Sequence, residues 1–114
     1  MKRICFDLDE TLVTSEKSEN GEMNYADAKP IEEVIEYAKR LKAEGNTIII
    51  YTARRMGKYR GNVGSVMAEV GKITIDTIEK YEIPCDELYF GKPCADIYID
   101  DKAHNHLSCG MPNL

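Results

Sequence analysis

The 114-residue sequence lacks several features that would define its class at once. No apolar run approaches the roughly 20 residues of a transmembrane helix. Asp7 and Asp9 interrupt the N-terminal apolar residues, so the long hydrophobic core of a signal peptide is missing. A Gly-x-x-x-x-Gly-Lys-Ser/Thr loop is also absent, which argues against P-loop kinases and NTPases. We therefore expect a cytoplasmic protein with no membrane partner.

Cysteine usage and charge exclude further classes. The four cysteines form no Cys-x-x-Cys pair, and their spacing to the two histidines is not that of a zinc site. Without a secretion signal, free thiols are expected. The net charge of −5 argues against nonspecific binding to nucleic acid or a membrane surface, but it does not exclude an anionic substrate at a local site. A hydrophobic content of 43% and a charged content of 31% are those of an ordinary globular protein.

The hydrophobic pattern predicts an α/β fold in a single domain that spans residues 1–114. Apolar runs predict strands, and apolar residues at helical spacing predict helices. The predicted strands are at about 3–8, 46–51, 88–90 and 96–100, and the predicted helices at about 30–44 and 62–82. Residues 101–107 are expected to form one or two helical turns, followed by an irregular tail at about 108–114. Strands that alternate with helices predict a parallel sheet with right-handed crossovers.

A polar segment follows the first predicted strand. Asn20-Gly21 within it is a strong signal for a tight hairpin, because that turn requires positive φ angles. We expect a short β-flap at about 12–28, with Leu12 and Val13 facing Met23 and Tyr25. Such a flap would form a partial lid over neighbouring side chains.

Polar and charged side chains follow each predicted strand, and the carboxyl ends of parallel strands are where α/β sheets bind ligands. The first strand is followed by Asp7, Asp9 and Thr11, the second by Thr52, Arg54 and Arg55, the third by Lys92, and the fourth by Asp100 and Asp101. Asp7 and Asp9 are two residues apart, so both point to the same face if the strand continues through them. The whole set is predicted to meet at one edge of the sheet.

This combination supports phosphoryl transfer through a covalent aspartyl phosphate. A carboxylate can act as the nucleophile, and a second acid, Asp9, would protonate the leaving oxygen and then activate water. Thr52 and Lys92 would bind the phosphate oxygens. Mg²⁺, a hard cation that prefers oxygen ligands, would be held by Asp7, the main-chain carbonyl of Asp9, and the Asp100/Asp101 pair. Which of the two acids in that pair ligates directly stays open.

The ordered set resembles the four motifs of the haloacid dehalogenase superfamily. The motifs are Asp7-Leu8-Asp9-Glu10-Thr11, Thr52 after an apolar strand, Lys92, and Tyr98-Ile99-Asp100-Asp101. The resemblance implies a three-layer Rossmann-like parallel sheet with helices on both faces and a β-hairpin flap after the first strand. It also implies the roles given above: nucleophile and acid/base for the first two acids, phosphate binding for the threonine and lysine, and metal binding for the last two acids.

The resemblance extends to a subgroup. An acid at Asp9 is what the phosphatases of the superfamily have, and the short spans between motifs leave no room for a cap domain. The segment from Gly91 to Ala103 further resembles small capless phosphatases associated with surface-polysaccharide biosynthesis. This implies a Mg²⁺-dependent phosphoric monoester hydrolase acting on a small phosphorylated substrate such as a sugar phosphate. Arg54 and Arg55 are candidates for binding a second anionic group of that substrate.

Three questions stay open at this stage. A site without a cap is either open to a large substrate or closed by a neighbouring subunit of a homo-oligomer. A non-enzymatic phospho-receiver-like signalling domain has similar length and acids, but it needs an acceptor Asp where this chain has Thr52. A degenerate fold that serves as a binding subunit is a further alternative, although it would gain nothing from keeping repulsive carboxylates.

Overall fold

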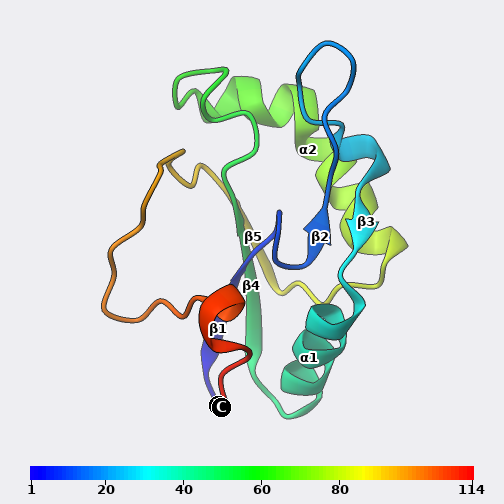
Figure 1. The fold of residues 1–114 in the computed structure, drawn as a ribbon. Helices are drawn as coiled ribbons and strands as arrows, with labels where there is room; N and C mark the ends of the chain where they lie inside the picture. The colour runs from blue at the N-terminus through cyan, green and yellow to red at the C-terminus, as the bar shows by residue number, and fades with distance from the viewer.

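Three parallel strands form the centre of the protein in the computed structural model, which describes residues 1–114 (Figure 1). The strands are β1 (Arg3–Asp7), β4 (Thr47–Thr52) and β5 (Glu87–Phe90), in the order β1-β4-β5. Two long helices, α1 (Glu32–Ala43) and α2 (Val63–Lys80), connect them. The structure therefore confirms the predicted α/β class and the parallel sheet. No helix of the protein combines the length and the apolar character that crossing a membrane requires.

The apolar patterns explain where these elements form. β4 lies between the other two strands, and Ile48 and Ile50 in it are fully buried. The predicted face of α1 is buried as well, and Val34, Ile35, Ala38 and Leu41 line it. α2 runs through Gly64 and Gly71 without a break, because burial of its other face outweighs the helix cost of about 1 kcal/mol for each glycine.

A second, antiparallel sheet of two short strands frames the flap. β2 (Val13–Thr14) pairs with β3 (Lys29–Pro30), and a 3₁₀ turn, η1 (Tyr25–Asp27), precedes β3. Between them, the chain forms a loop that projects from the body and is closed by a bridge between Lys17 and Met23 (Figure 1). The predicted flap is present, but Val13 pairs with Pro30 and not with Met23 or Tyr25. Pro30 thus belongs to β3, and α1 begins two residues later.

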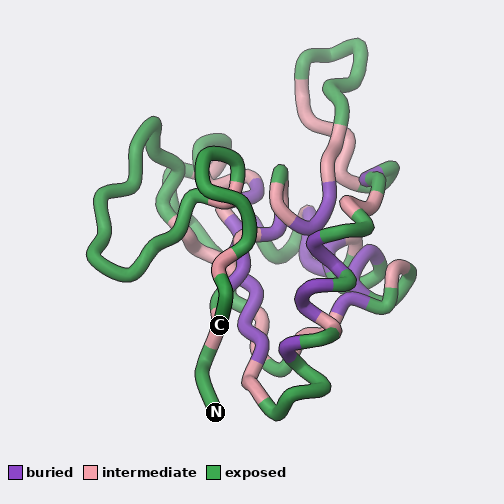
Figure 2. The backbone as a smooth tube through the Cα atoms, turned by 60° about the horizontal axis from the view of Figure 1, so that its bottom comes forward, coloured by how far each residue is buried: buried purple, intermediate pink, exposed green.

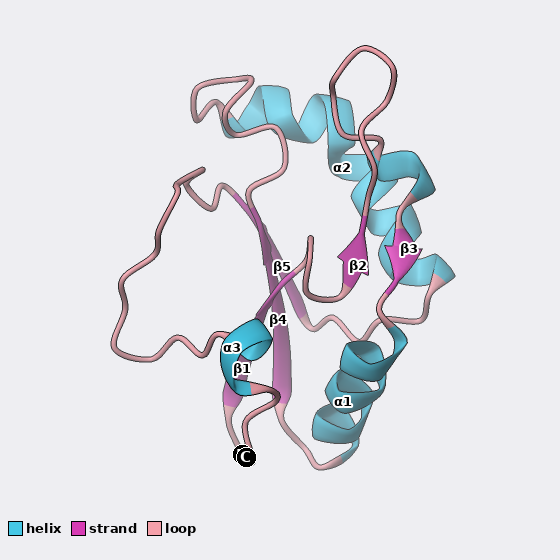
Figure 3. Cartoon of the chain, in the orientation of Figure 1, coloured by secondary structure: helices cyan, strands magenta, loops and turns pink.

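The two faces of the central sheet differ. Side chains of both α1 and α2 join one cluster with Phe6, Ile48 and Ile50, which all point to the same face. The opposite face carries Cys5, which is exposed, and Tyr51 and Tyr89, whose rings meet edge to face. Figure 3 shows both long helices on one side of the strands. The expected third layer is therefore not present in the single chain.

The predicted strand at 96–100 is wrong for this structure. Residues 93–105 are all exposed and make no sheet contacts, and they form an arc outside the body that ends at α3 (His106–Cys109) (Figures 2 and 3). A strand forms only where a neighbour supplies hydrogen bonds, and no strand of this chain pairs with the arc. The helical turn expected within 101–107 begins later, at His106, where the Asn105 side chain accepts hydrogen bonds from Leu107 N and Ser108 N.

The burial of β4 predicts a large loss of stability when one of its core side chains is shortened. Ile50→Ala is expected to lower the free energy of unfolding by about 2 to 5 kcal/mol, because it removes buried methyl groups and leaves a cavity. Ile75→Ala, on the exposed face of α2, should change it by no more than about 0.5 kcal/mol. Urea denaturation of both variants measures the difference, and equal effects would contradict this description of the core.

Candidate functional site

A tight turn after β1 positions the two acids. The carbonyl oxygen of Leu8 accepts hydrogen bonds from the backbone N–H groups of Leu12 (2.9 Å) and Val13 (3.1 Å). Glu10 lies within this turn at φ +64°, a left-handed conformation that is uncommon for a residue other than glycine. The turn folds the chain back at the end of the strand, so Asp7 and Asp9 both stay at the carboxyl edge of the sheet.

Lys92 reaches the same edge from β5. Its backbone N–H donates to the carbonyl of Thr52 (3.2 Å), which holds the segment after β5 against the end of β4. Its ammonium Nζ lies 3.5 Å from Asp7 Oδ1. Residues from three different strands therefore meet at one edge, as the sequence predicted for Asp7, Thr52 and Lys92.

The environment of Asp7 disfavours its charged form. Partial burial raises the pKa of Asp7 above its ordinary value, and the negative charge of Asp9 raises it further. The ammonium of Lys92 acts in the opposite direction but does not cancel the effect of burial. Carboxylates with perturbed pKa values of this kind cluster at functional sites.

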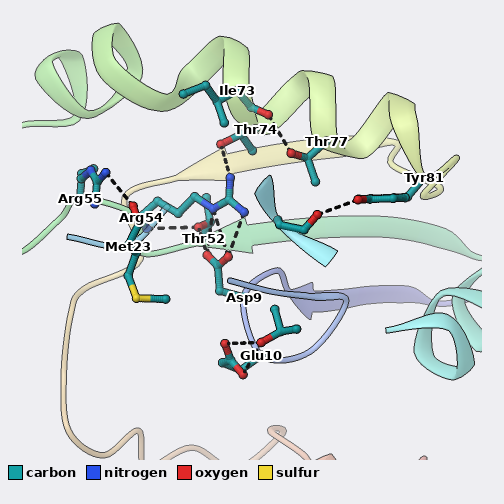
Figure 4. A network of polar contacts seen from close by, with 12 residues as sticks. Asp9, Glu10, Met23, Thr52, Arg54, Arg55, Ile73, Thr74, Thr77 and Tyr81 are labelled. Carbon is teal, nitrogen blue, oxygen red and sulfur yellow. Dashed lines mark hydrogen bonds and ion pairs between the residues drawn. The ribbon is translucent and has the colours of Figure 1, made fainter. Parts of the chain in front are cut away.

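Asp9 lies in a different environment from Asp7, as Figure 4 shows. The buried guanidinium of Arg54 holds its carboxylate, with Nε 2.9 Å from Oδ2 and Nη2 2.9 Å from Oδ1. Arg54 is only 1% exposed, and its Nη1 donates to the hydroxyl of Thr74 in α2 (3.0 Å). This charge-assisted, bidentate contact joins the turn after β1 to the loop after β4 and to α2.

Thr52 and Tyr25 complete the surroundings of this ion pair. The hydroxyl of Thr52 donates to Asp9 Oδ2 at 3.5 Å and accepts from the backbone N–H of Arg54 at 3.1 Å. The ring of Tyr25, at the base of the flap, lies under the guanidinium of Arg54 at 4.3 Å and under that of Arg55 at 4.8 Å. These cation–π contacts attach the flap to the site.

Arg55 belongs to a separate network between the flap and α2. Its guanidinium contacts Glu69 and donates to the carbonyl of Met23 (3.0 Å). Lys58 and Tyr59 also donate to Glu69, and these three donors lower the pKa of Glu69 to about 2. In this structure, the donors of Arg54 and Arg55 are thus occupied by protein groups, and substrate binding by either arginine stays a prediction.

The structure does not bring Asp100 and Asp101 to the site. Both are exposed on the arc of residues 93–105, and no three His, Cys, Asp or Glu side chains in the chain are grouped to hold a metal. Near β1, two carboxylates are available, and one of them is bound by Arg54. The residues of a single chain therefore do not fit the predicted Mg²⁺ site.

Comparisons with known proteins identify one relevant structure. No protein-family model and no curated protein matches the sequence. The fold is similar to the crystal structure of an MCSG target from Vibrio cholerae, with a TM-score of 0.86 and 34% sequence identity over 100% of this chain and 91% of that one. The two proteins belong to one family. The description of that structure names no activity, so the chemistry has to be argued from the residues.

Sequence reasoning missed the role of Arg54 and Thr74. Arg54 was expected to face the substrate, because a basic loop in an acidic protein favours that interpretation. Its actual partner, Asp9, lies 45 positions earlier, and the pairing depends on the two loops being adjacent. The signal available in the sequence was Thr74, a hydroxyl among the apolar positions of α2, which indicates a buried polar partner.

The raised pKa of Asp7 predicts a stability effect with a definite sign. At neutral pH, the folded protein keeps Asp7 charged at a cost, so Asp7→Asn should raise the melting temperature. This gain in melting temperature should disappear as the pH falls below the ordinary pKa of an aspartate, where Asp7 is protonated in both the folded and the unfolded state. Asp86→Asn should do the opposite at neutral pH, because the Ile48 N–H and Lys42 lower the pKa of Asp86. Thermal unfolding from pH 3 to 7 measures both, and a destabilised Asp7→Asn variant would contradict the assignment.

Because the guanidinium of Arg54 is buried, removing it should cause a large loss of stability. Arg54→Met is expected to destabilise the fold by roughly 3 to 5 kcal/mol, because Asp9 loses its cation and Thr74 its partner. Arg60→Met, an exposed arginine of the same loop, should change stability by no more than about 0.5 kcal/mol. Chemical denaturation compares them, and similar values would show that the pair with Asp9 contributes little.

Proposed function

We propose that the chain is a phosphoric monoester hydrolase that transfers the phosphoryl group of a small phosphorylated substrate to Asp7 and then to water. The observation that carries the proposal is the meeting of Asp7, Lys92 and Asp9 at the carboxyl edge of a parallel sheet. The motif resemblance described above supports the same reaction.

The steps follow from the positions of these groups. A carboxylate oxygen of Asp7 attacks phosphorus, and the bond from phosphorus to the ester oxygen breaks as that oxygen receives a proton from Asp9. Asp9 then takes a proton from water, whose oxygen attacks the phosphorus of the acyl phosphate. Inorganic phosphate leaves, and Asp7 is regenerated. Lys92, 3.5 Å from Asp7, supplies positive charge where the phosphate anion approaches.

Arg54 would position Asp9 for this role. A carboxylate has about four acceptor sites on its two oxygens, and the guanidinium occupies one side of the group. The Thr52 hydroxyl contacts the same carboxylate, so this side chain supports Asp9 in addition to its proposed contact with phosphate. Asp9 therefore keeps a fixed orientation while the other side of its carboxylate stays available to the substrate.

Four finer statements belong to the same proposal. The substrate is a small sugar phosphate or a related phosphometabolite, and the protein acts in the cytoplasm. Catalysis requires Mg²⁺, which would neutralise charge between Asp7 and the phosphate, although the single chain lacks the remaining ligands. The three-layer Rossmann-like arrangement also stays part of the proposal, although in the single chain both long helices pack on one face.

A phosphatase assay tests this function. The chain should release phosphate from p-nitrophenyl phosphate with Mg²⁺, and Asp7→Asn should reduce the rate at least about 1,000-fold because no nucleophile remains. Lys92→Ala should reduce it about 100-fold by removing charge from the transition state. Glu10→Gln is the matched control, because Glu10 lies in the same turn but is exposed and contacts only Thr14.

Two outcomes would contradict the hydrolase. Equal rates for the wild type and Asp7→Asn would remove the nucleophile from the scheme. Stoichiometric labelling by acetyl phosphate without turnover would favour the phospho-receiver-like domain instead. Mass spectrometry of the labelled chain separates this second outcome from simple lack of activity.

A further inference from the structure

The central sheet ends in an unpaired edge at β1. β1 pairs with β4 alone, and no hydrogen bond outside the sheet uses the backbone N–H and C=O groups of Arg3–Asp7. An edge of this kind is ready to accept another strand. The strand is short, and its inward side chains, Ile4 and Phe6, already belong to the core region.

The same chain presents a segment with strand character and no partner. Ile97 is 75% exposed and Ile99 is 97% exposed, although both are large apolar side chains. They alternate with polar residues in Asp96-Ile97-Tyr98-Ile99-Asp100, which is the pattern of a strand with one buried face. Apolar exposure of this extent marks an interaction site more often than a free surface.

The pattern of the segment matches that of β1 in one register. If Ile99 lies beside Phe6 and Ile97 beside Ile4, the apolar side chains extend the buried face of the sheet. Tyr98 then lies beside Cys5, on the open face. A shift by one residue would instead place the apolar side chains on the open face and the polar ones in the core.

The segment cannot reach this position on its own chain. The register of the sheet places Phe90 one residue beyond the level of Asp7. If Asp100 lies beside Asp7, Asp96 is displaced from Phe90 by about 17 Å along the strand direction and by three strand spacings across the sheet. The straight-line distance from Phe90 to Asp96 is then about 22 Å. The connection through residues 91–95 spans at most about 21 Å when fully extended. It could not cover the distance even along a straight line through the sheet, and a path around the sheet is longer. Parallel neighbours ordinarily need a connection of a dozen or more residues.

We propose that two copies of the chain exchange residues 96–100, each adding this segment as a parallel strand to the free β1 edge of the other. A reciprocal exchange closes the assembly as a symmetric dimer and does not continue into a filament.

The exchange would complete the site on each sheet. The matched register brings Asp100 of one copy beside Asp7 of the other, with Asp101 directly following. The acids that are missing from the single chain would thus come from the second copy. This part of the inference rests on the proposed phosphatase function, whereas the pairing of strands does not.

Oligomeric state tests the pairing without reference to activity. The purified protein should elute as a dimer in size-exclusion chromatography with light scattering. Ile99→Lys should convert it to a monomer, because a charge cannot be buried beside Phe6. Ile75→Lys places the same charge on an exposed apolar position of α2 and should leave the dimer intact. A monomeric wild type, or a dimer that is insensitive to Ile99→Lys, would overturn the proposal.

Disulfide cross-linking tests the register. In a chain whose other three cysteines are replaced by serine, Tyr98→Cys should form an intermolecular disulfide with Cys5 on oxidation, visible as a dimer on non-reducing gels. Ile97→Cys, on the opposite face of the segment, should cross-link at least about ten-fold more slowly. An intramolecular disulfide, or equal rates for both variants, would overturn the arrangement.

Subunit complementation tests the shared site. Asp7→Asn chains and Asp100→Asn/Asp101→Asn chains are co-expressed with different tags, and the heterodimer is purified on both. If the acids come from the other copy, one site has all of its acids and the other lacks Asp7, Asp100 and Asp101, so about half of the wild-type activity should return. If each chain builds its own site, the heterodimer should stay inactive. A dimer that cross-links while the wild type shows no phosphatase activity would refute the proposed function and leave the strand exchange standing.

Discussion

The ion pair between Arg54 and Asp9 is the contact on which the rest of the site depends. It is almost completely buried on the arginine side, and its donors reach the turn after β1, the hydroxyl of Thr74 in α2 and, through cation–π contact, Tyr25 at the base of the flap. A buried guanidinium that lost its carboxylate would be left with an uncompensated charge. The turn, the loop, the helix and the flap therefore have to adopt one relative arrangement, and this arrangement fixes the edge where Lys92 approaches Asp7.

The same ion pair separates the roles of two neighbouring carboxylates. Asp9 has a permanent cation, whereas burial raises the pKa of Asp7 and the nearest cation, Lys92, stands 3.5 Å away. Two acids of identical type in different environments are a common basis for dividing nucleophilic and acid/base roles. In this protein, the difference arises from the neighbours of each acid, because Asp9 meets the buried Arg54 of the loop after β4, whereas Asp7 faces Lys92.

The sequence predicted the features that depend on local residue patterns, but not those that depend on contacts between segments far apart in the chain. β1, β4 and β5 followed from local apolar runs, and the gathering of Asp7, Thr52 and Lys92 followed from parallel topology. The partner of Arg54 and the fate of residues 96–100 depended on contacts between distant segments. The alternation in 96–100 indicates strand propensity, but a strand forms only beside an acceptor, and the five residues after β5 do not lead to one, so the predicted strand was wrong.

An open β1 edge and an exposed apolar segment are each unfavourable in water, and pairing the segment with the edge would cover both. An uncovered edge strand can pair with the strands of other chains, and exposure of the apolar side chains of Ile97 and Ile99 to water is unfavourable. Pairing one with the other in a second copy satisfies the backbone of both and hides the apolar side chains on the face where Phe6 is already buried. Because the connection from β5 is too short for the chain to do this alone, the proposed pairing requires a second copy. If the proposed hydrolase function also holds, a site completed only on assembly would be inactive until two copies meet.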